Sequence, residues 1–500
     1  MKKLGNKKLI AVVVIAFAVM YLLLLIPEQK PSLSFSDSGS KTKQPFAWNQ
    51  DAYWESLERK YQELRKTGCK DMSLIIEADM LKLSALLRGI ERQQLSPDSR
   101  VLDELEQQVF QTGAFVGGCR MQLTQYIQAL VDMRDVVKRQ SERWDMNADV
   151  SRITLYRLLY GGRTAIEEIM LQTSQEAYPV MIKGRDEPSQ TPVADVRNVK
   201  IHSGDILVSR GGAPTSALIS RGNDYPGNFS HIAFVYVDPG THEAKIVESH
   251  IEVGVVVSTV EQYLKDKKLR VMLLRPRADL PQIMKDPMLP HNAAEFAYKR
   301  AKEGHIPYDF AMDYKDHSKL FCSEVASAGY EKFGIHLWAG ISRISSPGLR
   351  KWLAAFGVRH FETQEPSDLE YDPQLVVVAE WRDQATLKKD HYDNAVTEVM
   401  LEGAEKGDEI SYQWYLLPLA RIAKGYSVVM NLFGKPGPVP EGMSATAALR
   451  TQYYDKQHGA IKERLSLKAE EFKTTRGYAP PYWELVKLAR IAKEEVEKGK

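Results

Sequence analysis

The N-terminal segment constrains the fold most strongly, because it contains an unbroken apolar run. Leu9–Ile26 comprises 18 uncharged, apolar residues and is closed by Pro27 and Glu28. A helix of about 17–25 apolar residues spans a bilayer, so this run predicts one transmembrane helix. Residues 1–8 carry four lysines, and positive charge stays on the cytoplasmic side. We therefore expect a cytoplasmic stub of residues 1–8, a membrane segment of residues 9–26 and a body facing the periplasm or cell exterior.

A cleavable secretory signal peptide is the competing interpretation, since the lysines form a suitable start for one. The apolar run is long for that purpose, and it ends in Leu22–Pro27 without a small-residue cleavage site. No cysteine directly follows the run, which excludes a lipoprotein. The pattern favours an uncleaved signal anchor in the cytoplasmic (inner) membrane.

Charge and composition exclude several classes of protein. The net charge is +2, and because four positive charges lie in residues 1–8, the rest of the chain has a net charge of −2. A slightly acidic body argues against nucleic acid as the partner. Hydrophobic residues make up 44% of the 500 residues, which indicates a globular chain with more than one folded unit. Three cysteines are too few for a disulfide scaffold.

The texture of the chain changes several times after the apolar run. Residues 27–46 are polar and Ser-rich, which is typical of a flexible tether. Apolar residues then recur at spacings of three and four, which predicts a helical bundle. Residues 183–198 resemble a second linker. Short β-branched runs then predict an α+β domain, and a helical pattern of apolar residues returns near the end of the chain. The predicted units are the bundle 47–182, the linker 183–198, the α+β domain 199–382 and a C-terminal helical region 383–500. A protein partner on the two helical regions is an open possibility.

Two of the three cysteines lie where helices of the bundle are expected to end. Cys69 follows Gly68, and Cys119 follows Gly117 and Gly118. Outside the cytoplasm, a disulfide between Cys69 and Cys119 would tie two helix ends together. Two unpaired thiols are the alternative.

The third cysteine, Cys322, lies in the α+β domain at the predicted start of a helix. Unpaired backbone N–H groups and the positive end of the helix dipole favour a thiolate there, so we expect its pKa to lie below the usual value of about 8.5. The thiolate is the nucleophilic form. Strands are expected at Asp205–Val208, His231–Val237, Lys245–Glu248, Gly254–Ser258, Arg270–Leu274 and Leu375–Trp381, and helices at Asn292–Gly304 and from Cys322 to about Phe333.

A hairpin upstream of the cysteine supplies a base and a carboxylate. If Val237 pairs with His242 across a four-residue turn, His231 lies opposite Glu248, close enough for the carboxylate to orient the imidazole. A turn that is longer by two residues places His250 opposite His231 instead.

Five fragments in this order resemble a known family, the circularly permuted NlpC/P60 group of papain-like cysteine hydrolases, in its YiiX/YebB-like branch. In ordinary members the cysteine precedes the histidine strand, whereas here the histidine strand comes first. The resemblance covers about residues 199–350 and does not explain the helical regions. The fragments are Gly204-Asp-Ile, Phe229-Ser-His231-Ile-Ala, Ile246-Val-Glu248, Gly304-His-Ile-Pro-Tyr308-Asp309 and Phe321-Cys322-Ser-Glu324.

The resemblance implies a papain-like domain with an antiparallel sheet and a nucleophile helix. It assigns Cys322 as the nucleophile, His231 as the base and Glu248 as the residue that orients it. Tyr308 occupies the position of an oxyanion-binding tyrosine, with packing under the helix as its alternative role. Asp309 is expected to cap a loop, and Glu324 is read as an acid in the first helical turn that complements the dipole. Ordinary members have Asp-Cys-Ser-Gly where this chain has Phe-Cys-Ser-Glu, so the pocket is not specified.

These features together predict a membrane-anchored, extracytoplasmic cysteine hydrolase that cleaves an amide, with a cell-wall (peptidoglycan) peptide as the expected substrate. A thiol acyltransferase or lipid hydrolase with an acyl substrate, and a silent scaffold that works through its helical domains, are the alternatives. No cofactor is expected. His291, His305 and His317 precede Cys322, but their spacing fits no closed zinc pattern, and we expect them to be solvated or capping residues.

Overall fold

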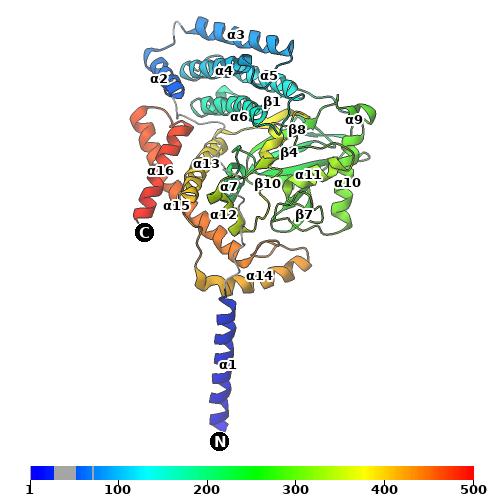
Figure 1. Cartoon of the computed structure of the whole chain (residues 1–500), viewed down its shortest axis with the longest axis vertical. Helices are drawn as coiled ribbons and strands as arrows, with labels where there is room; N and C mark the ends of the chain where they lie inside the picture. Colours follow the sequence, from blue (N-terminus) through cyan, green and yellow to red (C-terminus); the bar gives the residue numbers. More distant parts are fainter. Residues whose placement is uncertain (1, 27–51, 70–71, 500) are drawn as a thin grey trace.

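The computed structural model describes residues 2–26, 52–69 and 72–499, without the side chains of residues 2–10 and 52–55 (Figure 1). The predicted tether 27–46 lies outside the described residues. A long helix at the N-terminus projects from the body, a helical bundle lies at the far end, and a sheet with covering helices lies between them (Figure 1).

The N-terminal helix α1 extends over Lys2–Leu24 and includes the lysines that the sequence assigns to a separate stub. Its apolar side chains are exposed from Val12 to Leu23, for example Ile15 at 63% and Phe17 at 62%. In the part of the chain that the structure describes, no helix is long and apolar enough to cross a membrane, so the predicted transmembrane helix is not found there.

The predicted helical bundle consists of five helices packed around one core. Its buried side chains recur at helical spacing, as Leu102, Leu105 and Val109 show. The bundle confirms the helical region that the sequence predicts before the sheet. The helices are α2 (Ala52–Thr67), α3 (Ser73–Glu91), α4 (Arg100–Cys119), α5 (Leu123–Ser141) and α6 (Asp149–Leu171), followed by the short η1 (Gln175–Ala177).

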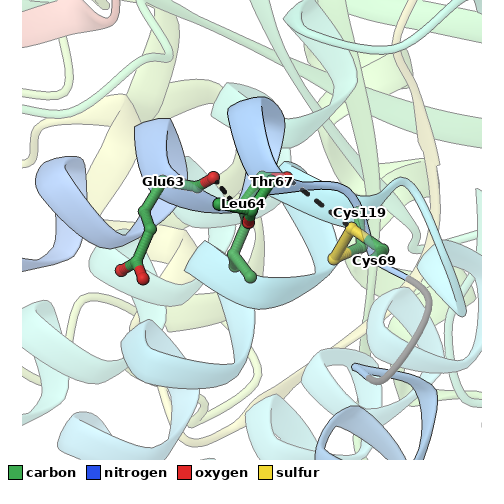
Figure 2. The surroundings of a disulfide bond; sticks show 5 residues. All are labelled: Glu63, Leu64, Thr67, Cys69 and Cys119. Atoms are coloured by element: carbon green, nitrogen blue, oxygen red, sulfur yellow. Dashed lines mark hydrogen bonds between the residues drawn. A yellow bond between two sulfur atoms is a disulfide. The ribbon is translucent and has the colours of Figure 1, made fainter.

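A disulfide joins Cys69, two residues after the end of α2, to Cys119, the last residue of α4 (Figure 2). These are the two cysteines that the sequence pairs at glycine-containing helix ends. Gly118 lets the two helices approach, because a Cβ at this position would lie 3.0 Å from the Cβ of Leu64 on α2.

The disulfide closes a loop of 50 residues, and removing such a cross-link from a folded domain costs about 2–5 kcal/mol. We expect mass mapping of protein kept away from reductant to recover the Cys69–Cys119 peptide pair. The double variant Cys69→Ser/Cys119→Ser should unfold at lower denaturant than the wild type, and reductant should shift only the wild type. Recovery of both residues as free thiols would contradict the pairing.

A seven-stranded antiparallel sheet forms the centre of the molecule, in the order β1-β11-β8-β4-β5-β6-β7. The sequence places β5 and β11 at their observed bounds and misses β1. The α+β class with an antiparallel sheet is thus confirmed. The strands are β1 (Met181–Lys183), β4 (Ile206–Gly211), β5 (His231–Val237), β6 (Ala244–His250), β7 (Gly254–Thr259), β8 (Lys268–Pro276) and β11 (Leu375–Trp381).

Strand alternation divides the buried residues of the sheet between two cores. Ile232 and Phe234 of β5 pack in one core with α10 (Leu289–Glu303) and α11 (Cys322–Glu331). Ala233 and Val235 face the opposite core, which contains Tyr263 of the short helix α8 (Val260–Lys265). Further helices of this part are α7 (Pro214–Arg221), α9 (Pro281–Lys285), α12 (Pro347–Phe356) and η2 (Pro366–Glu370), and β9 (Ser342–Arg343) pairs with β10 (Glu362–Thr363).

The segment 183–198, assigned to a linker from its composition, carries regular structure. It contains β2 (Val193–Val196), which pairs with β3 (Val199–His202). The last residue of β1, Lys183, also pairs with Ala379 of β11. The bundle and the sheet are therefore joined by paired strands.

The C-terminal region is helical, as the sequence predicts. Its first helix, α13 (Gln384–Glu405), packs against α7 and β8, and α16 packs against both α13 and α15. The remaining elements are η3 (Trp414–Leu416), α14 (Leu417–Leu432), α15 (Ala445–Arg476) and α16 (Tyr482–Lys498). In Figure 1, α14 lies beside the C-terminal end of α1, away from the bundle.

A buried cluster of charges joins the bundle, the sheet and α13. Glu167 of α6 accepts from Arg163 at 3.0 Å and from Arg270 of β8 at 2.6 Å. Arg270 also contacts Asp390 of α13 at 2.5 Å, and Asp390 accepts from Arg210 of β4 at 3.1 Å. All five side chains are at most 3% exposed. Because charges are costly to bury unless they are paired, this cluster favours one mutual arrangement of the three parts.

Candidate active site

Cys322 is the first residue of α11, as the sequence predicts for a nucleophile helix. Phe321 precedes it with extended backbone, and a carboxyl oxygen of Glu324 accepts from the Phe321 N–H at 2.8 Å. This bond fixes the start of the helix from within its first turn. The thiol donates to the backbone carbonyl of Ser230, with sulfur and oxygen 3.9 Å apart.

The ionisation of the thiol differs from the expectation. Cys322 is 5% exposed, and burial raises the pKa of its thiol to about 12, although backbone N–H groups of Ile232 and Ser323 act in the opposite direction. Loss of hydration therefore outweighs the helix N-terminus. The prediction of a low pKa is wrong for the substrate-free protein, in which Cys322 is a thiol at neutral pH.

We expect Cys322 to react slowly with iodoacetamide at pH 7, because only the thiolate is nucleophilic and little of it is present. Mass spectrometry of timed samples measures the rate, and the same protein in denaturant is the control, since unfolding restores an ordinary thiol. Labelling of the folded protein faster than a model thiol at pH 7 would show a thiolate that this structure does not support.

The hairpin of β5 and β6 has a different register from the expected one. Val237 pairs with Ala244, and Ala233 rather than His231 pairs with Glu248. The turn is longer by two residues because the carboxylate of Asp238 accepts from the N–H groups of Gly240 and Thr241, and His242 has a φ of +58°. The prediction of a four-residue turn is therefore wrong. The observed register is the alternative one, which places His250 opposite His231.

The expected contact between His231 and Glu248 nevertheless forms, along the diagonal of the hairpin. Nε2 of His231 lies 2.8 Å from Oε2 of Glu248, and Nε2 of His250 lies 3.2 Å from Oε1. Ser258 of β7 donates to the same carboxylate at 3.0 Å. Glu248 is 2% exposed, so one buried carboxylate holds two imidazoles.

The pKa values of the two histidines shift in opposite directions. Burial lowers the pKa of His231, although its bond to Glu248 acts in the opposite direction. Burial also acts to lower the pKa of His250, but there the bond to Glu248 prevails and raises it. Burial opposes ionisation of Glu248, yet its bonds to the two histidines lower its pKa. His231 is therefore neutral at pH 7, the form that accepts a proton.

Cys322 contacts the backbone before and after His231 at the start of β5. The thiol contacts Ser230 and the N–H of Ile232, the residues that flank His231, while the imidazole turns toward Glu248. Among the hydrogen bonds of the described residues, none joins Cys322 directly to His231. Catalytic hydrogen bonds are often long or misaligned before a substrate binds.

His231, Glu248 and His250 have the chemistry of metal ligands as well. Their ligand atoms lie within 4.8 Å of one another, and two imidazoles with one carboxylate form a common ligand set for catalytic zinc. A metal held there would occupy the nitrogen that His231 presents to Glu248. The histidines considered for zinc from their spacing lie apart: His291 contacts Ser203, His305 contacts Glu441 and His317 contacts Glu331.

Three other residues that the resemblance singles out surround the cysteine. Tyr308 lines the same cavity as Cys322, and burial together with that thiol raises its pKa well above the usual value, so the phenol keeps its proton. Asp309 accepts from the N–H groups of Ala311 and Asp313, which confirms its loop-capping role. Burial raises the pKa of Glu324 to about 9, so it caps the helix as a neutral acid and adds no charge to the dipole.

A cavity of about 150 Å³ adjoins the thiol, and most of its wall is apolar. Its wall residues come from both the sheet domain and the C-terminal region, and no sequence motif indicates that these two parts meet. An apolar cavity of this size holds an apolar group as large as a benzene ring. Apolar wall residues include Leu218, Phe310, Leu353, Phe356, Val358 and Met443.

Glu365 is a cavity residue that the sequence analysis missed. It is 3% exposed, and burial and Asp368 raise the pKa of its carboxyl well above the usual value. Its carboxyl therefore resists ionisation, and a negative charge on it would act against a thiolate at Cys322. No motif surrounds Glu365 in the sequence, so only its position in the fold reveals it.

A cysteine that opens a helix on an antiparallel sheet, after the histidine strand in the chain, defines a permuted papain-like domain. Residues 200–379 match the model of the permuted papain-like amidase enzymes, YaeF/YiiX, C92 family, and this part of the chain belongs to that family. The chain also matches the crystal structure of metalloprotein yiiX from Escherichia coli O157:H7, with 16% identity and a TM-score of 0.29, over 36% of this chain and 98% of that one. No curated protein matches the chain.

Proposed function

We propose that this protein is a cysteine amidase in which Cys322 is the nucleophile, His231 the base and Glu248 the group that orients the base. The observation that carries the proposal is a thiol at a helix start beside the strand of a neutral histidine bonded to a buried carboxylate. The membership of residues 200–379 in an amidase family supports it.

The chemistry follows from the protonation states. His231 removes the thiol proton as the sulfur attacks the amide carbonyl, which yields a tetrahedral intermediate with a negative oxygen. Backbone N–H groups at the start of α11 and the protonated Tyr308 stabilise the oxyanion in this proposal, and one such donor is worth about 2.7–4 kcal/mol. His231 then protonates the leaving amine, whose departure leaves the acyl-enzyme. His231 finally activates the water that releases the acyl group and restores the thiol.

The cavity favours an acyl chain over a cell-wall peptide as the part of the substrate next to Cys322. Peptides of the cell wall are polar, whereas Phe310, Leu353 and Met443 offer no hydrogen bonds from their side chains. The apolar cavity wall therefore favours acyl-lipid hydrolysis or acyl transfer over peptide cleavage.

We propose further that α1 anchors the protein in the inner membrane with the body outside the cytoplasm. Val12, Ile15 and Phe17 are exposed on different sides of the helix, and a helix that is apolar all round is ordinarily covered by protein or lipid. The Cys69–Cys119 disulfide supports an oxidising compartment. Protein from a membrane preparation should stay in the pellet through a high-salt wash, and protease added to spheroplasts should digest the body.

The substrate test uses the full-length protein in detergent with three substrates: muropeptides, N-acyl amides with long chains, and phospholipids. We expect release of fatty acid from the N-acyl amide by the wild type and none by Cys322→Ala. Leu353→Gln places an amide group in the cavity wall and should reduce turnover of long acyl chains more than that of short ones. Turnover of muropeptides alone would restore the cell-wall peptide as substrate, and absence of turnover with all three would favour the scaffold.

A further inference from the structure

We propose that the exposed apolar face of η3 and α14 lies on the surface of a lipid bilayer, beside the point where α1 enters it. This interfacial face consists of Trp414, Tyr415, Leu419, Ile422, Tyr426, Val429, Leu432 and Phe433. The inference rests on the membrane anchor proposed above and adds a second membrane contact, made by the body.

The interfacial face is a continuous stripe along one side of a helix. Leu419, Ile422, Tyr426, Val429 and Phe433 follow one another at spacings of three and four residues, and each is more than half exposed. The opposite side carries small residues that pack against the body. There Ser427 is fully buried and accepts from the N–H of Val439, and Gly437 approaches it closely.

The position of α14 relative to α1 is held by side-chain contacts. Arg421 donates to the carbonyls of Leu24 and Ile26, at 2.8 and 2.7 Å, and so satisfies the end of α1. Tyr21 of α1 donates to the carbonyl of Tyr415 at 3.1 Å. In Figure 1, α14 runs across the end of α1. A bilayer that contained α1 would therefore reach the interfacial face.

The chemistry of the segment fits a lipid surface better than a second protein. Residues 411–440 contain three basic residues and no acid. Trp414, Tyr415 and Tyr426 are of the types that concentrate at the membrane–water interface. A helix with one apolar face lies in that interface, and continuity with the exposed apolar surface of α1 makes lipid the occupant that covers both.

Helix α14 also contacts residues that line the cavity beside Cys322. Ala423 of α14 packs in a small cluster with Phe310 and Met443, and these two residues also line the cavity beside Cys322. A body seated on the bilayer through α14 would thus hold the cavity wall close to the lipid, the source of long acyl chains.

The test uses the full-length protein reconstituted in phosphatidylethanolamine–phosphatidylglycerol vesicles, with or without bromine on the acyl chains. The emission of Trp414 is obtained by subtracting the spectrum of Trp414→Phe from that of the wild type. We expect this emission to be lost in brominated vesicles and retained in the others. Trp483, which donates to Glu58 of the bundle helix α2, supplies the control through Trp483→Phe, whose difference spectrum should not respond to bromine.

A matched pair of variants separates the interfacial face from exposed apolar residues in general. Ile422→Gln/Tyr426→Gln/Val429→Gln should restore Trp414 emission in brominated vesicles. Leu74→Gln/Ile75→Gln/Leu81→Gln changes three exposed apolar residues of α3, at the opposite end of the molecule, and should leave the quenching unchanged (Figure 1).

Failure of this inference and failure of the anchor give different results. If the protein resists a high-salt wash but brominated lipid does not quench Trp414, the inference is wrong and the anchor stands. If Trp414 is shielded from acrylamide in water without responding to brominated lipid, a protein surface covers the face, which also overturns the inference. If quenching occurs although the wash releases the protein, the face binds lipid and the anchor fails.

Discussion

Cys322→Ala is expected to reduce amide hydrolysis by about 10³-fold or more, since loss of the nucleophile removes the covalent path as a whole. His231→Ala should cost nearly as much, because nucleophile and base act as one unit. Initial rates with the N-acyl amide, at enzyme concentrations that reveal residual activity, measure both. Circular dichroism and a thermal melt of each variant serve to exclude unfolding as the cause.

His250→Ala is the matched control for the base. His231 and His250 bond to the same carboxylate, but only His231 belongs to the backbone segment that the thiol contacts. We expect His250→Ala to cause a much smaller loss than His231→Ala. An equal loss from both, together with sensitivity to a chelator, would instead indicate a metal held by His231, Glu248 and His250.

The pH dependence follows from the same groups. His231 must be neutral to accept the thiol proton, and burial places its pKa below the ordinary value of 6.5, so activity should persist below pH 6.5 before it falls. The thiol pKa of about 12 means that no increase from thiolate formation is expected near pH 8.5. A steep gain in activity through pH 8–9 would show that an ordinary thiol limits the reaction.

The parts of the site that the sequence predicted correctly depend on neighbouring residues. Apolar alternation and the flanking turns define β5, and the spacing after Cys322 defines α11, so both begin where the sequence places them. The register of the hairpin depends on how Asp238 folds the turn, and strand patterns do not record it. Even so, Glu248 reaches His231, because a long side chain spans the diagonal of a hairpin.

The features that the sequence could not predict come from residues far apart in the chain. Cys322 is buried beside a cavity whose wall includes Met443, from the segment before α15 and outside the residues that match the family. That burial reverses the expected direction of the thiol pKa. The charge cluster is equally remote, since Arg270 lies 103 residues from Glu167 and 120 from Asp390.

Among the single substitutions proposed for this protein, Glu167→Gln is expected to lower the free energy of unfolding most. The substitution keeps the shape of the side chain but leaves Arg163 and Arg270 buried, with one counter-charge removed. Breaking a buried ion pair from one side costs about 3–5 kcal/mol, because the remaining charge cannot recover its hydration. Urea unfolding at pH 7, followed by circular dichroism, measures the change.

Glu63→Gln is the matched control, since Glu63 pairs with Lys60 on the surface of the same bundle, with both side chains more than 40% exposed. An exposed pair is worth about 0–1 kcal/mol, so this variant should unfold almost as the wild type does. Equal effects of the two substitutions would show that the buried cluster does not stabilise the arrangement of bundle, sheet and α13.

The difference in unfolding free energy between wild type and Glu167→Gln should also depend on pH, and its sign follows from the pKa of Glu167. Burial acts against the charge of Glu167, but Arg270 and Arg163 lower its pKa well below the ordinary value of 4.5. A depressed carboxylate pKa stabilises the folded state above the pKa of the unfolded chain and loses that contribution as the pH falls toward the folded value. The difference in unfolding free energy between the two proteins should therefore be full at pH 7 and narrow below about pH 4.5, since the unfolded wild type then gains a proton that folded Glu167 does not take up.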